Sequence, residues 1–254
     1  REAINNENLE IYYQPKLDLK TGITRGVEAL IRWKHPERGF VSPDEIIYIA
    51  EHTGLIKHLT RWVIKEAIRQ CHEWHIRGHK LNIAVNLSVQ NLQDPGLSNV
   101  IESILETYQF PAECLILEVT ESAMMLEPEH ATKILSKLDE MGVWISIDDF
   151  GTGFSSLAYL KQLPVDELKI DKSFVMNMNN NENDAVIVRS TIDLARNLGL
   201  KIVAEGVENE DTWDMLHVLG ADFAQGFFMS KPLCLKDIDA WLDNDLKAPN
   251  VSGQ

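Results

Sequence analysis

The chain has 254 residues, and 24 Lys and Arg against 39 Asp and Glu give it a net charge of −15. This balance argues against non-specific nucleic-acid binding, which needs a basic face, and no apolar run reaches the roughly 18 residues needed to span a bilayer. We therefore expect no nucleic-acid partner and no membrane contact from this domain. Three widely separated cysteines without a CxxC pair favour buried thiols in a reducing cytoplasm, which is the location we expect.

Strand-like and helix-like segments alternate along the chain. Residues Ser42 and Pro43 are suited to begin a helix as its N-cap and first helical residue, and Glu45 is placed for a capping box. Two later helical patterns stop at Gly142 and Gly199, as helices commonly do at glycine. Eight strands are predicted, at residues 9–19, 23–33, 81–88, 114–122, 143–150, 167–171, 201–207 and 223–228.

This alternation predicts the fold class. Strands alternating with helices are typical of parallel βαβ units, and eight of them suggest a barrel, whose usual length of about 250 residues fits this chain. Only "KTG" separates the first two strands, which is too short for a parallel crossover. We therefore expect an α/β, TIM-like (β/α)8 barrel whose first strand runs antiparallel to the others.

We expect residues 1–254 to form a single domain, because no linker-like composition and no internal repeat divides them. The last ~10 residues read as a disordered tail. Since the chain begins at Arg1 rather than at Met, we interpret it as part of a longer multidomain protein. Any membrane anchor of that parent protein would lie outside this sequence.

Polar side chains interrupt the apolar strands near their C-terminal ends. Each one alone is most simply a solvated strand end, but their recurrence on seven successive strands indicates a site. Because every second strand residue points into a barrel, these side chains can converge on its mouth, where barrel enzymes carry their chemistry. In strand order they are Glu28 and Arg32, Asn86, Glu118, Asp148 and Asp149, Lys169 and Asp171, Glu205, and Gln225.

The composition of this ring predicts a metal site. Carboxylates and an amide oxygen, with no Cys or His at matching positions, suit Mg²⁺ or Mn²⁺ rather than zinc. Two such ions bridged by a shared Asp are a recurring solution for splitting phosphate esters. Asp148 is predicted to bridge two ions and Asp149 to hold one, while Gly151 and Gly153 let the next loop close over a phosphate. Lys169 is predicted to orient the attacking water or to stabilise charge on the phosphoryl oxygens.

Seven blocks of the sequence, in order and spacing, resemble the EAL family of bacterial cyclic di-GMP phosphodiesterases. The blocks are "EALIRW", "NLS", "LEVTES", "DDFGTGFSSLAYL", "LKID", "AEGVE" and "QGFFMSKPL". The resemblance covers essentially the whole chain, from "YYQP" to "SKPL". It implies metal-dependent hydrolysis of cyclic di-GMP to linear pGpG, by in-line attack of a metal-activated water on one phosphodiester.

The resemblance also implies roles for individual residues. Two divalent cations, Mg²⁺ or Mn²⁺, would be held by Glu28, Asn86, Glu118, Asp148, Asp149 and Glu205. The catalytic residues would be Glu28, Lys169, Glu205 and Gln225. The substrate contacts would be Gln14, Arg32, Asp171 and Gln225. The anchor of the "DFGTG" loop would be Glu121 with Gly151 and Gly153.

Partners follow from the same resemblance. It implies a homodimer formed through the helices that flank the fifth and sixth strands. It also implies an upstream sensory, receiver or GGDEF domain in a full-length signalling protein.

Two alternatives stay open at this point. The first is a catalytically weak receptor or scaffold domain that binds cyclic di-GMP without cutting it. The intact acidic set counts against a receptor without excluding it. The second is a magnesium-dependent barrel enzyme of an enolising class, with Lys169 as its base. The two adjacent aspartates and the glycine-rich loop fit phosphodiester chemistry better.

Overall fold

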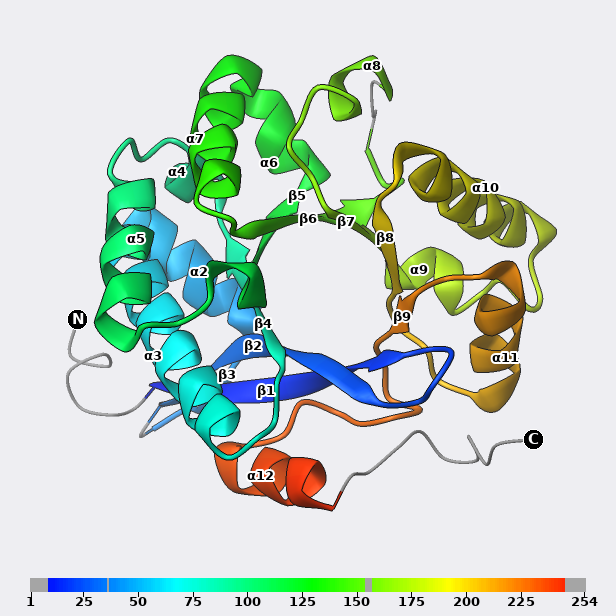
Figure 1. The fold of residues 1–254 in the computed structure, drawn as a ribbon, viewed down its shortest axis with the longest axis horizontal. Coiled ribbons are helices and arrows are strands. Elements are labelled where there is room, and N and C mark those ends of the chain that lie inside the picture. Colours follow the sequence, from blue (N-terminus) through cyan, green and yellow to red (C-terminus); the bar gives the residue numbers. More distant parts are fainter. Residues whose placement is uncertain (1–8, 36, 154–156, 245–254) are drawn as a thin grey trace.

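In this computed structural model, the structure describes residues 9–35, 37–153 and 157–244. Within these residues, eight strands close into a barrel with helices around its outside (Figure 1). The barrel follows the order β1-β9-β8-β7-β6-β5-β4-β2 and closes through the pairing of β2 with β1. Its strands are β1 (Leu9–Asp18), β2 (Thr24–His35), β4 (Asn82–Leu87), β5 (Leu115–Thr120), β6 (Trp144–Phe150), β7 (Glu167–Ile170), β8 (Lys201–Ala204) and β9 (Phe223–Ala224).

The first strand runs antiparallel to both of its neighbours, β2 and β9, and the other barrel pairings are parallel. A tight turn makes this possible. The Asp18 carboxylate accepts a hydrogen bond from the Thr21 N–H at 2.7 Å, and Gly22 adopts a left-handed φ of +68°. The prediction of a (β/α)8 TIM-like barrel with an antiparallel first strand is confirmed.

Several strand boundaries differ from the sequence prediction; β8, for example, ends at Ala204 rather than at residue 207. A short β3 (Gly39–Val41), which was not predicted, pairs antiparallel with the end of β2. The fourth predicted strand ends at Thr120, because the Thr120 hydroxyl caps a helix by accepting from the Ala123 N–H. The last strand ends at Ala224 rather than at residue 228, because the chain turns at Gly226, whose C=O accepts from two later N–H groups.

The helix starts and stops follow the predicted signals. The Ser42 hydroxyl accepts from the Glu45 N–H, but the Glu45 carboxylate pairs with Arg38 at 2.8 Å. Gly142 and Gly199 have φ values of +86° and +75° at two helix ends. The helices are α2 (Pro43–His52), α3 (Ile56–Ile76), α4 (Val89–Leu92), α5 (Leu97–Tyr108), α6 (Glu121–Leu126), α7 (Pro128–Glu140), α8 (Leu157–Leu160), α9 (Lys172–Val175), α10 (Glu182–Leu198), α11 (Glu210–Leu219) and α12 (Leu235–Asp243), with a 3-10 turn at Ala112–Cys114.

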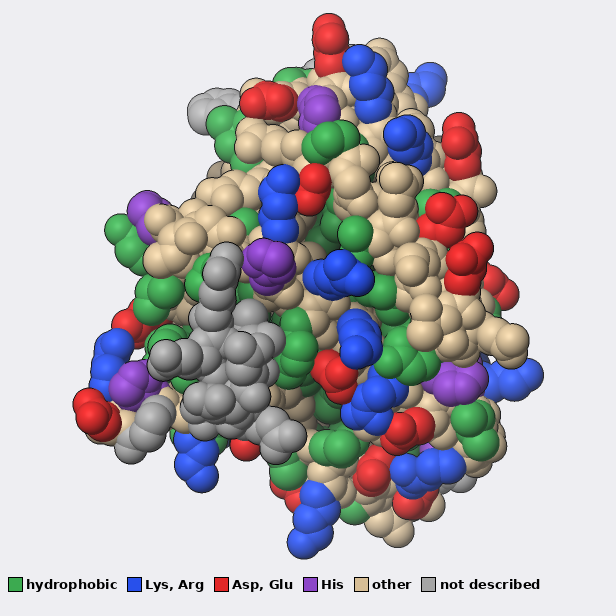
Figure 2. All heavy atoms as spheres, turned by 90° about the vertical axis from the view of Figure 1, so that its left-hand side faces the viewer, with side chains coloured by type: hydrophobic (Ala, Val, Ile, Leu, Met, Phe, Trp, Pro, Cys, Tyr) green, Lys and Arg blue, Asp and Glu red, His purple; other side chains and the backbone are tan. Residues whose placement is uncertain are grey.

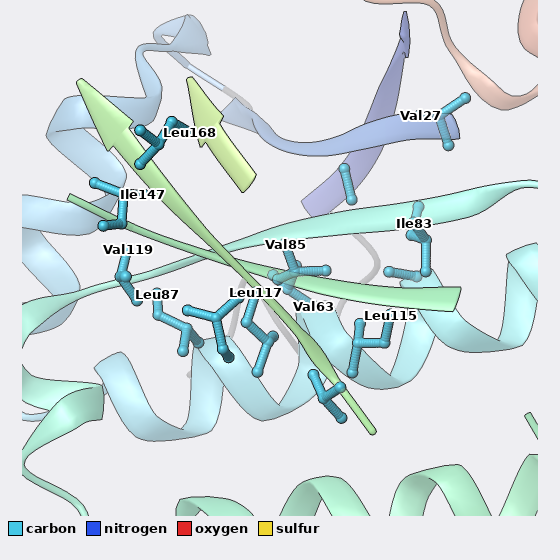
Figure 3. Packing of buried hydrophobic residues seen from close by; sticks show 14 of the residues in the cluster. Val27, Val63, Ile83, Val85, Leu87, Leu115, Leu117, Val119, Ile147 and Leu168 are labelled. Carbon is cyan, nitrogen blue, oxygen red and sulfur yellow. The ribbon is translucent and has the colours of Figure 1, made fainter. Parts of the chain in front are cut away.

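The main hydrophobic core lies between the strands and the surrounding helices. Leu115, Leu117 and Val119 alternate along β5, are fully buried, and pack toward α3 together with residues of the neighbouring strands (Figure 3). Burying each such side chain contributes about 1.5–3 kcal/mol. This layer fixes the strand registers and therefore the positions of the strand ends.

A second set of buried residues fills the inside of the barrel. Ala84, Ile116 and Val203 are buried but lie outside the outer core cluster. The charged side chains of Lys16 and Glu167 are buried as well and form an ion pair. The inside of the barrel is thus partly polar below its mouth.

No helix among the described residues is long and apolar enough to cross a membrane. On the face shown in Figure 2, several Lys and Arg side chains form a row down the middle, with Asp and Glu side chains beside them. The predicted tail, 245–254, lies outside the described residues.

Candidate active site

A pocket of about 890 Å³ opens at the mouth of the barrel, beside the C-terminal ends of the parallel strands. This volume is within the range of small-molecule sites. Seven of the residues predicted from the sequence line it: Gln14, Glu28, Asn86, Asp148, Asp149, Glu205 and Gln225. The expectation that these side chains converge is therefore confirmed.

Lys169 lies at the centre of the acidic cluster and is only 1% exposed. Its Nζ atom lies 2.7 Å from Glu205 Oε1, 2.9 Å from Glu118 Oε2 and 3.2 Å from Asp148 Oδ1. Glu28 Oε2 follows at 3.8 Å. One ammonium group from β7 thus contacts carboxylates that come from four other places around the barrel.

Two amide side chains orient Glu28. Asn86 Nδ2 donates to Glu28 Oε1 at 2.7 Å, and Gln225 Nε2 donates to the other carboxylate oxygen. Gln225 Nε2 also lies 3.1 Å from Gln14 Oε1, and Gln14 donates in turn to the Ser230 C=O at 3.0 Å. Each oxygen of Glu28 therefore has an amide donor, and residues from both ends of the chain hold it in place.

Asp148 and Asp149 both reach the mouth because β6 is irregular. In a regular strand, adjacent residues face opposite sides of the sheet. Here the β6–β7 register shifts between Ile147 and Phe150, and Asp149 has a left-handed φ of +55°. As a result, Asp148, Asp149 and Glu205 each offer an oxygen atom within 4.8 Å of the others.

The backbone after β8 is hydrogen-bonded to the backbone after β9. The Val207 N–H donates to the Gln225 C=O at 3.2 Å, and the Phe228 N–H donates to the Val207 C=O at 2.9 Å. A Cβ atom at Gly226 would collide with the backbone N and O atoms of Val207. This close approach, which only glycine permits, sets the positions of Glu205 and Gln225 relative to each other.

The electrostatics of the cluster fit bound cations. Burial, followed by the charge of Asp148, raises the pKa of Glu205 to about 7. Burial and the charges of Asp148 and Asp171 raise the pKa of Asp149 to about 6. Burial and the Glu28 charge raise the pKa of Glu118 well above its ordinary value. A single ammonium group does not neutralise five carboxylates, and a set of hard oxygen donors is what divalent cations such as Mg²⁺ prefer.

The same charges keep Lys169 protonated. Burial alone would lower its pKa, but the carboxylates of Asp148 and Glu118, with two others, raise it well above the ordinary value. Burial would likewise raise the pKa of Glu28, but the Lys169 charge and the amide hydrogen bonds lower it. In the metal-free protein this lysine therefore donates hydrogen bonds to the carboxylates around it.

Glu121 lies against the glycine-rich loop and forms one hydrogen bond with it. It is the first residue of α6, is buried, and its Oε2 accepts from the Gly151 N–H at 3.2 Å. A Cβ atom at Gly153 would lie 2.8 Å from Glu121 Oε1, and Gly151 has a φ of +98°. The position predicted for the loop anchor agrees with these contacts. The next three residues, 154–156, lie outside the described part of the chain.

The structure does not bring Arg32 and Asp171 into the described lining of the pocket. Arg32 donates to the Ile31 C=O at 2.8 Å and lies over the Tyr12 ring, with 5.7 Å from its Cζ atom to the ring centroid. Asp171 caps α9 by accepting from both the N–H and the hydroxyl group of Ser173. Their predicted roles in substrate binding stay predictions.

One wall of the pocket was not predicted. Apolar side chains from α2 and α3 line it, including Pro43, Ile47, Ile56, Leu59 and Val63. Their helical spacing is also that of an ordinary core-facing helix, so the sequence pattern gave no signal of a ligand surface. The site therefore combines an acidic floor with an apolar side wall.

Comparisons with known proteins agree with this geometry. The sequence profile described as the EAL domain matches residues 1–232. The bifunctional diguanylate cyclase/cyclic di-GMP phosphodiesterase MucR of Pseudomonas aeruginosa is 45% identical over 234 residues, which are 92% of this chain and 34% of MucR. The cyclic di-GMP phosphodiesterase NbdA of the same organism is 41% identical over 243 residues, 95% of this chain and 31% of NbdA.

Similarity also extends to a solved structure. The PaMucR phosphodiesterase in a c-di-GMP complex has a TM-score of 0.90 at 44% identity, covering 94% of this chain and 97% of that one. The chain spans about a third of the length of the two curated relatives.

Proposed function

The chain belongs to the EAL domain family, and from that premise we propose that it hydrolyses cyclic di-GMP to linear pGpG with the help of two divalent cations, Mg²⁺ or Mn²⁺. The observation that carries the proposal is the convergence of Asp148, Asp149 and Glu205, whose oxygen atoms lie within 4.8 Å of one another beside the buried Lys169. The phosphodiesterase activity named for MucR and NbdA supports the choice of substrate.

Each residue of the site has a role in this proposal. The cations would be held by Glu28, Asn86, Glu118, Asp148, Asp149 and Glu205. When bound, they lower the pKa of a water molecule and neutralise charge that develops on the phosphoryl oxygens. Lys169 stays protonated and donates a hydrogen bond to the attacking water or to a phosphoryl oxygen. Gln225 holds the carboxylate of Glu28 in one orientation, so that the water is aligned opposite the leaving 3′ oxygen.

The remaining predicted residues surround this centre. Gln14, which lines the pocket, would contact the substrate directly. Arg32 and Asp171 would contact the ligand at the edge of the pocket: Asp171 lies next to Asp149, and the planar guanidinium of Arg32 suits a phosphate. Glu121 would hold the loop that contains Gly151 next to the metal-binding aspartates.

Homodimerisation and an upstream domain are part of the same proposal. Met125 and Leu126 on α6, which lies in the chain between the fourth and fifth barrel strands (β5 and β6), are 39% and 66% exposed, as expected of apolar side chains that a second copy could cover. MucR, whose name pairs a cyclase with a phosphodiesterase, is about three times as long as its matching region, so we also propose a GGDEF, sensory or receiver domain upstream. We propose a cytoplasmic location, since the three described cysteines are free thiols, as is usual in a reducing compartment.

One experiment tests the activity. The protein is incubated with cyclic di-GMP and either Mg²⁺ or Mn²⁺, and the products are separated by chromatography. We expect pGpG to accumulate with the ions and not in excess EDTA. Binding of cyclic di-GMP without cleavage would instead support the receptor alternative, and full turnover in EDTA would contradict the metal requirement.

A further inference from the structure

A buried ion pair lies inside the barrel below the acidic cluster. Lys16 Nζ lies 3.0 Å and 2.8 Å from the two carboxylate oxygens of Glu167. The Ser146 hydroxyl donates to Glu167 Oε1 at 3.1 Å. The side chains of Lys16 and Glu167 are 6% and 1% exposed. Both oxygens of Glu167 are therefore fully engaged.

The strand registers place this pair directly beneath the site. Ser146 is paired with Glu118 on one side and with Glu167 on the other, so the three side chains share one face of the sheet. Glu167 and Lys169 are two residues apart on β7 and therefore face the same way. Lys16 comes from β1, which is separated from β7 by β9 and β8, so its side chain crosses the inside of the barrel.

The ammonium group of Lys169 points to the mouth of the barrel and not to Glu167. Among the described residues, the carboxylates within 4 Å of its Nζ atom are those of Glu28, Glu118, Asp148 and Glu205, all at the mouth. Glu167 is not among them, although it is the next inward-facing residue on the same strand. A lysine side chain is a flexible chain with a compact charge, and an unpaired buried carboxylate below it would compete for its ammonium group.

Fold stability alone does not account for this arrangement. A buried ion pair can often be replaced by apolar side chains of similar volume without loss of stability, whereas removal of one partner leaves an uncompensated charge. The position of the pair, one layer below the cluster on the same strand as Lys169, points to an electrostatic role in the site.

We propose that Lys16 neutralises Glu167, with Ser146 as a further hydrogen-bond donor, and that this keeps the ammonium group of Lys169 directed at the mouth of the barrel. Lys16, Ser146 and Glu167 are positioning residues that act through Lys169 and do not touch the substrate. The kinetic part of this inference rests on the proposed phosphodiesterase function.

The test compares Lys16→Met with the neutral double variant Lys16→Met/Glu167→Gln. In Lys16→Met, Lys169 turns toward Glu167, so kcat for cyclic di-GMP falls by about tenfold or more while KM changes little. Mn²⁺ affinity, measured by calorimetry, stays equal or becomes tighter, because the carboxylates at the mouth lose their competing lysine. The double variant carries no competing anion, and its kcat returns to within a factor of about two of the wild type.

Controls separate positioning from general damage. Lys201→Met removes a lysine whose ion pair with Asp222 lies at the surface, and it is expected to change neither kcat nor Mn²⁺ affinity. If Lys16→Met were merely packed unfavourably, the protein would lose Mn²⁺ affinity together with kcat. The proposal instead expects kcat to fall while Mn²⁺ affinity stays equal or becomes tighter. A kcat of Lys16→Met equal to that of the wild type would overturn the proposal, and so would an equal loss of kcat in the double variant.

The proposal can still be tested if Lys16→Met does not fold or if the wild type does not cleave cyclic di-GMP. If Lys16→Met does not fold, a folded double variant with a tenfold lower kcat still contradicts the proposal, and Ser146→Ala, which removes only the hydroxyl donor to Glu167, takes the place of Lys16→Met as the variant expected to lose kcat. If the wild type does not cleave cyclic di-GMP, the proposed function fails by itself. The crystal structure of Lys16→Met then tests the inference: Lys169 Nζ moves to Glu167 if it holds, and stays on Asp148 and Glu205 if it does not.

Discussion

A side chain on Gly153 would collide with Glu121: a Cβ atom at this glycine would lie 2.8 Å from the Glu121 Oε1 atom. The other oxygen of Glu121 accepts a hydrogen bond from the Gly151 N–H. Through this hydrogen bond, and with no room for a side chain at Gly153, the start of α6 lies against the loop that begins two residues after Asp149. The loop and the acidic cluster are therefore mechanically connected.

Weakening this connection is expected to loosen the loop and the aspartates before it. Glu121→Ala leaves the Gly151 N–H without its acceptor, and we expect kcat to fall by about tenfold and Mn²⁺ affinity to weaken. Glu121→Gln is the matched control, since its amide oxygen can still accept from this N–H. Steady-state kinetics with calorimetry of Mn²⁺ binding measures both effects. Equal behaviour of the wild type and Glu121→Ala would show that Glu121 does not support the site.

Gly226→Ala is expected to separate Glu205 from Gln225. The new methyl group would collide with the backbone of Val207, so the two loops that carry these residues must move apart. We expect a destabilisation of about 2 kcal/mol or more and a loss of kcat beyond what the change in stability explains. Thermal unfolding and kinetics below the melting temperature measure the two effects. Gly96→Ala offers a control, since Gly96 has a φ of −88° and its Cβ would meet only Asp94 Oδ1, at 3.5 Å. A Gly226→Ala protein with normal kcat would contradict this role.

The ring of carboxylates could be predicted from the sequence because it depends only on local rules. Strand alternation and strand ends determine where Glu28, Glu118 and Glu205 point, and the short turn at "KTG" determines the direction of β1. Seven of the predicted residues accordingly line one pocket.

The parts that were not predicted depend on contacts between distant segments. Alternation alone would place Asp148 and Asp149 on opposite faces of the sheet, and only the bulge and the φ of +55° bring both to the mouth. Lys16 and Glu167 are 151 positions apart, so no local pattern reveals that they form an ion pair. Arg32 was expected at the mouth from its parity with Glu28, but its guanidinium lies over the Tyr12 ring and it is not among the described residues that line the pocket.

The raised pKa values in the cluster predict how the stability of the metal-free protein depends on pH. Glu205 titrates at about 7 rather than 4.5, and Asp149 at about 6 rather than 3.8. At pH values between the unfolded and the folded pKa of each group, the folded protein binds more protons than the unfolded chain does. The free energy of unfolding therefore falls as the pH rises from 4 to 7. We expect the melting temperature without metal to drop by about 5 °C or more over this range.

Metal binding should reverse this dependence. Because the cations displace protons from Glu205 and Asp149, Mn²⁺ affinity should increase with pH, and binding at pH 6.5, between the two pKa values, should release protons. Calorimetry in buffers of different ionisation enthalpy counts the protons released. A melting temperature that is independent of pH, together with no proton release, would contradict the description of the cluster.

Lys169→Met is expected to separate catalysis from metal binding. Without the ammonium group, kcat should fall by roughly 10²–10³, since a charged donor to the reacting atoms is lost. Mn²⁺ affinity should stay the same or increase, because the lysine no longer competes for Glu205 and Asp148. A protein that kept normal kcat without this side chain would show that Lys169 plays no part in the reaction.

The central claim is that carboxylates from separate strands bind a pair of divalent cations at the mouth of this barrel. Crystals soaked in Mn²⁺ test it most directly, through the anomalous scattering of the metal. The account predicts two peaks among the oxygens of Glu28, Asp148, Asp149 and Glu205, and their disappearance in Asp148→Ala. Wild-type crystals that show no peak at these residues, at Mn²⁺ concentrations that support turnover, would contradict it.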